Sequence, residues 1–149
     1  MTKILGISCY YHDSSVSLIE NGNIVFALQE ERFSRLKHDS SFPQKSMKYL
    51  LNQLDLKIND IDYIVFHEKP FLKFERLIET YLKNTPRGLT SFLKAMPLWI
   101  KQKIFQKKIL TDELKKIEPN LKLKNDLLFS QHHLSHAASA FYPSPFSDA

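Results

Sequence analysis

The chain has 149 residues, of which 43% are hydrophobic and 25% are charged, the composition of a globular domain that can bury a hydrophobic core. A single cysteine excludes a disulfide framework, and three glycines leave no room for a P-loop or a Gly-x-Gly-x-x-Gly motif. The sequence has no secretory signal and no apolar run of membrane-spanning length, so we expect a cytoplasmic protein with no membrane partner.

The formal net charge of +5 is concentrated in one segment. Between residues 101 and 125 there are eight lysines and three acidic residues. A basic helical face of this kind can contact nucleic acid, an acidic membrane surface or a partner protein. Because no arginines or aromatic residues are regularly interleaved with these lysines, we favour a solvated face and expect no nucleic-acid partner.

The sequence pattern at the beginning of the chain predicts three short strands. Apolar, β-like runs occupy residues 4–9, 16–19 and 24–28. Asn21 and Gly22 separate the second run from the third, and both residues tolerate the positive φ of a tight hairpin turn. The pattern therefore predicts a three-strand antiparallel meander.

A helix and a fourth strand are predicted next. Pro43 suits the first turn of a helix, and apolar residues recur at three- and four-residue spacing from Met47 to Leu54. The β-branched run at residues 61–66 predicts a buried strand.

The region that follows is expected to be helical. We expect one helix over residues 71–81 and a second helical section over residues 89–117, kinked or divided at Pro97. Thr111 precedes two acidic residues and is expected to cap the start of a further helix.

The last predicted elements are a short strand at residues 127–129 and a helix at residues 132–141, which Pro143 stops. The complete order of elements is typical of an α/β fold. A three-strand antiparallel meander followed by helix-linked parallel strands is similar to the ribonuclease-H-like half-domain of the actin-like ATPase superfold.

The strongest local signal for chemistry is a pair of histidines in the last predicted helix. His132 and His136 are four residues apart, so their imidazoles lie on one helical face and can bind a transition metal together. The alternative is that both are polar surface residues that only form hydrogen bonds, because two ligands do not complete a metal site.

A second signal lies between the first two predicted strands, where His12 is followed by Asp13. A neutral imidazole can accept a proton from a substrate hydroxyl, and a neighbouring carboxylate can orient the ring. The residues that follow are also ordinary turn formers, so a purely structural turn is the alternative.

A third signal is the charged stretch after the third predicted strand. Arg32, Arg35 and Lys37 can bind phosphate or acyl-phosphate oxygens, or they can form a solvated ion-pair network. His67 follows the fourth predicted strand and has no partner nearby in the sequence, so we expect it to be structural or exposed.

Together these stretches resemble the ATP-dependent O-carbamoyltransferases, the group that decorates nodulation factors and antibiotics. The resemblance covers the whole chain. The stretches that carry it are ILGIS at 4–8, YHDS at 11–14, QEERFSR at 29–35, KHD at 37–39, FP at 42–43 and HHLSHAASAFYPSPF at 132–146.

The resemblance implies an actin-like domain, related to the tRNA threonylcarbamoyladenosine synthases, that passes a carbamoyl group from carbamoyl-adenylate to the hydroxyl of a small-molecule acceptor. Carbamoyl phosphate and ATP are the usual donors. By position, His12 would be the catalytic base and Lys37 would bind the negatively charged donor. His132 and His136 would be ligands of iron or another divalent transition metal.

Members of that family continue beyond the equivalent of Ala149 into a second lobe and usually into an adenylate-forming domain. We therefore expect residues 1–149 to be the N-terminal lobe of a carbamoyltransferase that works with a remaining lobe or chain. The alternative is a catalytically inactive remnant or a protein-interaction module that uses the basic helical face.

Overall fold

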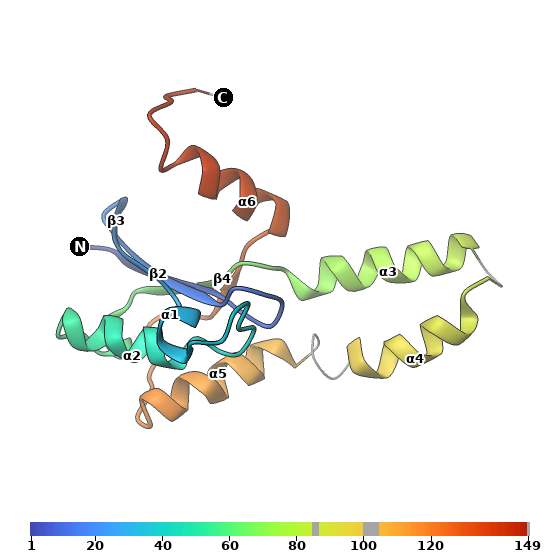
Figure 1. Ribbon diagram of the computed structural model, residues 1–149, viewed down its shortest axis with the longest axis horizontal. Coiled ribbons are helices and arrows are strands. Elements are labelled where there is room, and N and C mark those ends of the chain that lie inside the picture. Colours follow the sequence, from blue (N-terminus) through green and yellow to red (C-terminus); the bar gives the residue numbers. More distant parts are fainter. Residues whose placement is uncertain (85–86, 100–104, 149) are drawn as a thin grey trace. The chain divides into compact units, whose positions relative to one another are not determined.

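The computed structural model describes residues 1–84, 87–99 and 105–148 (Figure 1). The chain forms two compact units. The sheet unit contains Met1–Glu68 and Glu113–Ala149, and the helical unit contains Lys69–Asp112. Both histidine-bearing signals from the sequence belong to the sheet unit.

The sheet unit is built on a five-stranded mixed sheet with the order β3-β2-β1-β4-β5. Its strands are β1 (Lys3–Ser8), β2 (Ser15–Glu20), β3 (Asn23–Gln29), β4 (Tyr63–Phe66) and β5 (Leu128–Phe129). Strands β1, β2 and β3 pair antiparallel in chain order, whereas β4 pairs parallel with both β1 and β5. Helices accompany this sheet, so the α/β class predicted from the sequence is confirmed.

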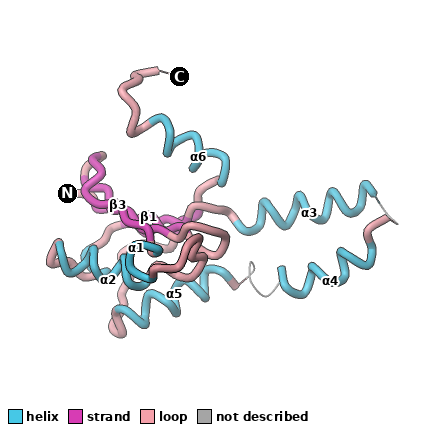
Figure 2. Tube along the Cα trace, in the orientation of Figure 1, coloured by secondary structure: helices cyan, strands magenta, loops and turns pink. Residues whose placement is uncertain are grey.

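The helices of the sheet unit connect or follow the strands. They are α1 (Glu31–Ser34), α2 (Gln44–Gln53), the short 3-10 helix η1 (Ile58–Asp60) and α6 (His132–Phe141). Figures 1 and 2 show α2 on one side of the sheet and α6 on the other. The turn between β2 and β3 has Asn21 at φ 50° and Gly22 at φ 87°, the positive values that the sequence predicts there.

One face of the sheet carries the core. Alternate residues of the three middle strands are buried and lie opposite one another in the register, namely Leu5, Ile7, Val16, Leu18, Ile64 and Phe66. Helix α2 contributes Met47, Leu50 and Leu51, which are also buried. The helix and the sheet therefore share one apolar layer.

The second face of the sheet is only partly covered. Ile4 lies opposite Ile19 and Tyr63, and Ile19 lies opposite Ile24, so these side chains share a face. Ile24 is 55% exposed and Tyr63 is 38% exposed. These four apolar side chains, which we call the open face, are thus partly in contact with solvent.

The helical unit contains α3 (Pro70–Asn84) and α4 (Leu89–Trp99), and α5 (Gln106–Ile117) begins in it. Tyr81 of α3 stacks on Phe92 of α4 with ring centroids 3.9 Å apart. Pro97 lies inside α4, two residues before its end, and not at a division between helices. Residues 100–104, which fall within the predicted section 89–117, lie outside the described residues.

The prediction that Thr111 caps a new helix is wrong. Thr111 lies in the middle of α5, where its hydroxyl donates a hydrogen bond to the carbonyl of Lys107 at 2.8 Å. A threonine hydroxyl can bond to the carbonyl four residues earlier as well as cap a helix start. Leu110 and Leu114, both buried and four residues apart, continue one helical stripe across this position.

The lysine-rich segment is only partly described, because Lys101 and Lys103 fall outside the described residues. Lys116 forms an ion pair with Glu113 at 2.6 Å, and Lys124 forms one with Asp62 at 2.8 Å. Some of the positive charge of the lysine-rich segment is therefore neutralised by acidic residues of the same chain. Across the described part of the chain, no helix is both long enough and apolar enough to cross a membrane.

Candidate functional site

The candidate site lies where the parallel strands β1, β4 and β5 end. Each of these strands leads directly into a segment that contains a histidine: His12 after β1, His67 after β4 and His132 after β5. The carboxyl ends of neighbouring parallel strands meet at one edge of a sheet, and this edge is where open α/β sheets bind ligands. The topology thus brings together residues that are far apart in the sequence.

The two histidines of α6 converge. The Nε2 atoms of His132 and His136 lie 3.1 Å apart, and the ring centroids are 4.5 Å apart. The helix begins at His132 after Gln131 in an extended conformation, so His132 occupies its first turn. His136 is exposed and His132 is partly buried.

This arrangement fits a transition metal. Two nitrogens that share a metal at about 2.0–2.1 Å lie about 2.8–3.4 Å apart when the angle at the metal is between a right angle and a tetrahedral one. The distance of 3.1 Å between the two Nε2 atoms falls in that range. In the protein without metal, the same distance suits a hydrogen bond from one imidazole to the other.

The end of β4 adds two more potential ligands. His67, Glu68 and His132 each offer a ligand atom, and these atoms lie within 4.8 Å of one another. Glu68 is 3% exposed, and its Oε2 lies 3.8 Å from Nδ1 of His132. The His67 ring centroid is 5.8 Å from that of His132. His67, which we expect from the sequence to be structural or exposed, is partly buried beside His132.

Helix α6 is tied to β4 by hydrogen bonds. The hydroxyl of Ser135 donates to the carbonyl of His67 at 3.0 Å, and the N–H of Ser130 donates to the carbonyl of Phe66 at 2.8 Å. Ser135 lies between the two histidines in the sequence, so this bond holds the same helical turn that presents them. The spacing of the two histidines gives no indication of this role for Ser135.

The His12 segment forms a second cluster at the same edge. Asp13 accepts a hydrogen bond from Nδ1 of His12 at 2.8 Å on one oxygen and from Nδ1 of His38 at 2.9 Å on the other. These bonds, first the one from His38 and then the one from His12, hold the pKa of Asp13 below its ordinary value. With its Nδ1 engaged, His12 is left with Nε2 to contact a ligand.

Backbone hydrogen bonds join the two loops that form this cluster. The N–H of Tyr10 donates to the carbonyl of Ser40, and the N–H of Ser14 donates to the carbonyl of Asp39, both at 2.8 Å. The loop after β1 is therefore clamped to the segment that carries His38. This contact spans 25 residues between Asp13 and His38, a separation that local sequence patterns do not reveal.

The charged stretch that follows β3 contains a buried carboxylate with a structural role and a lysine that is exposed. Glu30 is 3% exposed and accepts hydrogen bonds from the N–H of Lys45 and from the N–H and hydroxyl of Ser46, at the start of α2. A carboxylate at this place satisfies free amides of the helix start. Lys37 is exposed and precedes His38 in the clamped segment.

Tyr10 lines a hollow beside the His12 cluster. Burial raises the pKa of the Tyr10 phenol well above its ordinary value, and the neighbouring Cys9 and Glu113 raise it further. A protonated phenol can donate a hydrogen bond. The hollow has a volume of about 510 Å³, and Asp39 and Ser41 of the clamped segment also line it.

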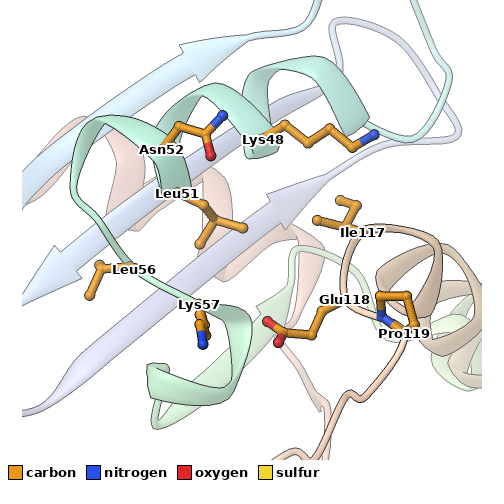
Figure 3. Close-up of a pocket in the computed structure, with 8 residues that line it drawn as sticks. All are labelled: Lys48, Leu51, Asn52, Leu56, Lys57, Ile117, Glu118 and Pro119. Atoms are coloured by element: carbon orange, nitrogen blue, oxygen red, sulfur yellow. The ribbon is translucent and has the colours of Figure 1, made fainter.

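A second hollow, of about 380 Å³, lies away from this edge. Figure 3 shows Leu51 and Ile117 pointing toward it, with Lys57 and Glu118 nearby. Glu118 accepts a hydrogen bond from the N–H of Ile58, which precedes β4, whereas His67 follows β4. This hollow therefore belongs to the amino end of β4 and is separate from the histidine clusters.

Comparison with known proteins supplies the family context. A family described as "Carbamoyltransferase N-terminus" matches residues 3–149. The protein sll1178 of Synechocystis sp., described as uncharacterized, is 52% identical over 100% of this chain and 24% of its own length. The nodulation protein NolNO of Sinorhizobium fredii is 27% identical over 94% of this chain and 19% of its own length.

A third relative is the protein MJ1058 of Methanocaldococcus jannaschii, also described as uncharacterized. It is 28% identical over 98% of this chain and 29% of its own length. The chain thus spans between about a fifth and three tenths of the lengths of these three relatives.

Proposed function

The chain belongs to the carbamoyltransferase N-terminus family, and from this premise we propose that it supplies one lobe of an enzyme that transfers a carbamoyl group to an acceptor hydroxyl. The donor in this proposal is carbamoyl-adenylate, formed from carbamoyl phosphate and ATP. The observation that carries the proposal is the His12–Asp13 pair at the sheet edge that also holds the His132–His136 pair.

In this proposal His12 is the catalytic base. Nε2 of His12 accepts the proton of the acceptor hydroxyl as its oxygen forms a bond to the carbamoyl carbon. The bond from that carbon to the adenylate oxygen breaks, and AMP leaves. Asp13, which accepts the hydrogen bond from Nδ1 at 2.8 Å, keeps the ring oriented and stabilises its charged form.

Two further groups would bind the negatively charged parts of the donor. Lys37, exposed in the segment that carries His38, would bind the anionic donor. His132 and His136 would hold iron or another divalent transition metal, as the 3.1 Å separation of their Nε2 atoms allows. When bound, the metal supplies a positive charge that stabilises phosphate oxygens.

We also propose that the sheet unit is a ribonuclease-H-like half-domain of the actin-like superfold. The strand order β3-β2-β1-β4-β5, with antiparallel β1 to β3 and parallel β4 and β5, supports this assignment. Because the relatives are three to five times longer, the rest of the catalytic cleft would come from further polypeptide.

The test is a chimera in which this chain replaces the matching quarter of the Synechocystis relative. His12→Ala should lower the transfer of labelled carbamoyl to hydroxylated acceptors by about 10²–10⁴-fold, the usual contribution of a general base. Pyrophosphate release that depends on carbamoyl phosphate should continue, because adenylate formation does not use this base. His133→Ala, a change of the same kind at an exposed position, is the control.

The same assay separates this proposal from its alternative. If the chain is an inactive remnant or an interaction module, His12→Ala leaves transfer as it is in the unmodified chimera. Loss of both transfer and pyrophosphate release would contradict the assignment of His12 as the base.

A further inference from the structure

We propose that Glu68 is a positioning residue for His132: its buried carboxylate receives the Nδ1–H of His132 and so directs the Nε2 lone pair toward the metal position shared with His136. This inference rests on the metal pair of the proposed function. It concerns a residue that the sequence motifs do not include, contributed by a different strand.

The burial of Glu68 is the first argument. Among the described residues, two carboxylates are buried, Glu30 and Glu68, each 3% exposed. Removing an ionised carboxylate from water is costly unless donors compensate it. For Glu30 the donors are those at the start of α2. Glu68 lies beside the imidazole of His132, with Oε2 at 3.8 Å from Nδ1.

The geometry of His132 is the second argument. One of its ring nitrogens faces Glu68 and the other faces His136, at 3.8 Å and 3.1 Å respectively. A neutral imidazole has one N–H and one lone pair. If the N–H is on Nδ1, facing the carboxylate, then Nε2 carries the lone pair that a metal requires. Carboxylates that hold the second nitrogen of a metal-binding histidine are a recurring arrangement.

The backbone makes this pairing persistent. Glu68 lies two residues beyond the end of β4, and His132 is the first residue of α6. The hydrogen bond from the Ser135 hydroxyl to the His67 carbonyl links the two segments. A closing movement of less than 1 Å would bring Oε2 and Nδ1 from 3.8 Å to hydrogen-bond distance, which the metal-bound arrangement would favour.

The first experiment measures Zn²⁺ affinity of the 149-residue chain by calorimetric titration, with Zn²⁺ as a redox-silent probe. Glu68→Leu should weaken the affinity about 10- to 100-fold. Glu68→Gln keeps an acceptor oxygen and should weaken it less. Glu30→Gln, a change at the other buried carboxylate, should lower the thermal midpoint and leave the affinity at its original value. His136→Ala should remove binding.

Two outcomes of this titration would overturn the proposal. If Glu68→Leu binds Zn²⁺ as tightly as the unmodified chain, Glu68 does not position the ligand. If Glu68→Leu removes binding as completely as His136→Ala does, Glu68 is itself a ligand and not a positioning residue.

The second experiment works on the metal-free chain and separates this inference from the proposed function. Nitrogen-15 NMR at a pH where the imidazole is neutral should find the proton of His132 on Nδ1, and Glu68→Leu should move it to Nε2. A proton on Nε2 in the unmodified chain overturns the inference. A chain that binds no Zn²⁺ but keeps the Nδ1–H form contradicts the metal proposal alone and supports the Glu68–His132 pairing.

Discussion

Asp13 joins two imidazoles at the turn after β1, and its chemistry cannot be reproduced by the isosteric amide. As a carboxylate it accepts hydrogen bonds on both oxygens, one from His12 and one from His38. An asparagine offers one acceptor oxygen and one donor group, so it can accept from only one of these rings. The residue therefore determines the orientation of His12 as well as the local structure.

This property gives a pH-dependent prediction for Asp13→Asn. The pKa of Asp13 in the folded protein is lower than the ordinary value of 3.8, because the carboxylate accepts hydrogen bonds from His38 and His12. Such a group stabilises the folded state above its unfolded-state pKa, and this stabilisation is lost as the pH falls through the lower folded-state value. The unfolding free energies of the unmodified and substituted chains should therefore differ at neutral pH and converge in acid.

Urea unfolding at a series of pH values measures this difference. Asp148→Asn, at an exposed carboxylate near the end of the chain, is the control and should show no such convergence. A difference for Asp13→Asn that stays constant from neutral pH into acid would show that the two hydrogen bonds do not stabilise the ionised form.

At the scale of single residues, the sequence predicts which side chains act together when they belong to the same local segment. The spacing of His132 and His136 predicts that they share a helical face, and the structure places their Nε2 atoms 3.1 Å apart. Glu68 is 64 residues away from His132 in the sequence, and periodicity carries no information over that separation. The available signal was topological, because His67 and Glu68 directly follow a strand that was expected to be parallel to its neighbours.

The elements of the sheet unit follow from their apolar patterns. The observed strands and α6 lie within two residues of the ranges that the sequence predicts. The error at Thr111 has a different origin: a threonine before acidic residues is typical of a helix start, but the same hydroxyl can bond inside a helix. The buried stripe of α5 decided between these two possibilities.

The layer under helix α2 and the open face predict losses of different size for the same kind of substitution. Leu50 is 0% exposed in the layer between α2 and the sheet, so Leu50→Ala should lower the free energy of unfolding by about 2–5 kcal/mol. Ile24 is 55% exposed on the open face, so Ile24→Ala should cost about 1 kcal/mol or less. Urea unfolding of the two variants measures both values. Equal losses would mean that the open face is covered in the isolated chain.

At the scale of the whole molecule, the open face and the greater length of the relatives bear on one question, namely whether further polypeptide covers this face. On the open face, the apolar side chains of Ile24 and Tyr63 are 55% and 38% exposed. The Synechocystis relative is about four times longer than the region it shares with this chain. Under the proposed function, we expect further polypeptide to cover these side chains.

A charged substitution on the open face distinguishes a face that is covered by further polypeptide from one that stays in solvent. In the isolated chain, Ile24→Glu should change the free energy of unfolding by no more than about 1 kcal/mol, because the carboxylate remains in water. In the chimera with the Synechocystis relative, the same carboxylate would be buried without a partner, and the thermal midpoint should fall by several degrees or the chimera should fail to fold. Lys48→Glu, at an exposed position on α2, is the control for the added charge. If Ile24→Glu is tolerated equally in both proteins, the remaining polypeptide does not cover the open face, and the surface at β3 stays in solvent in the chimera.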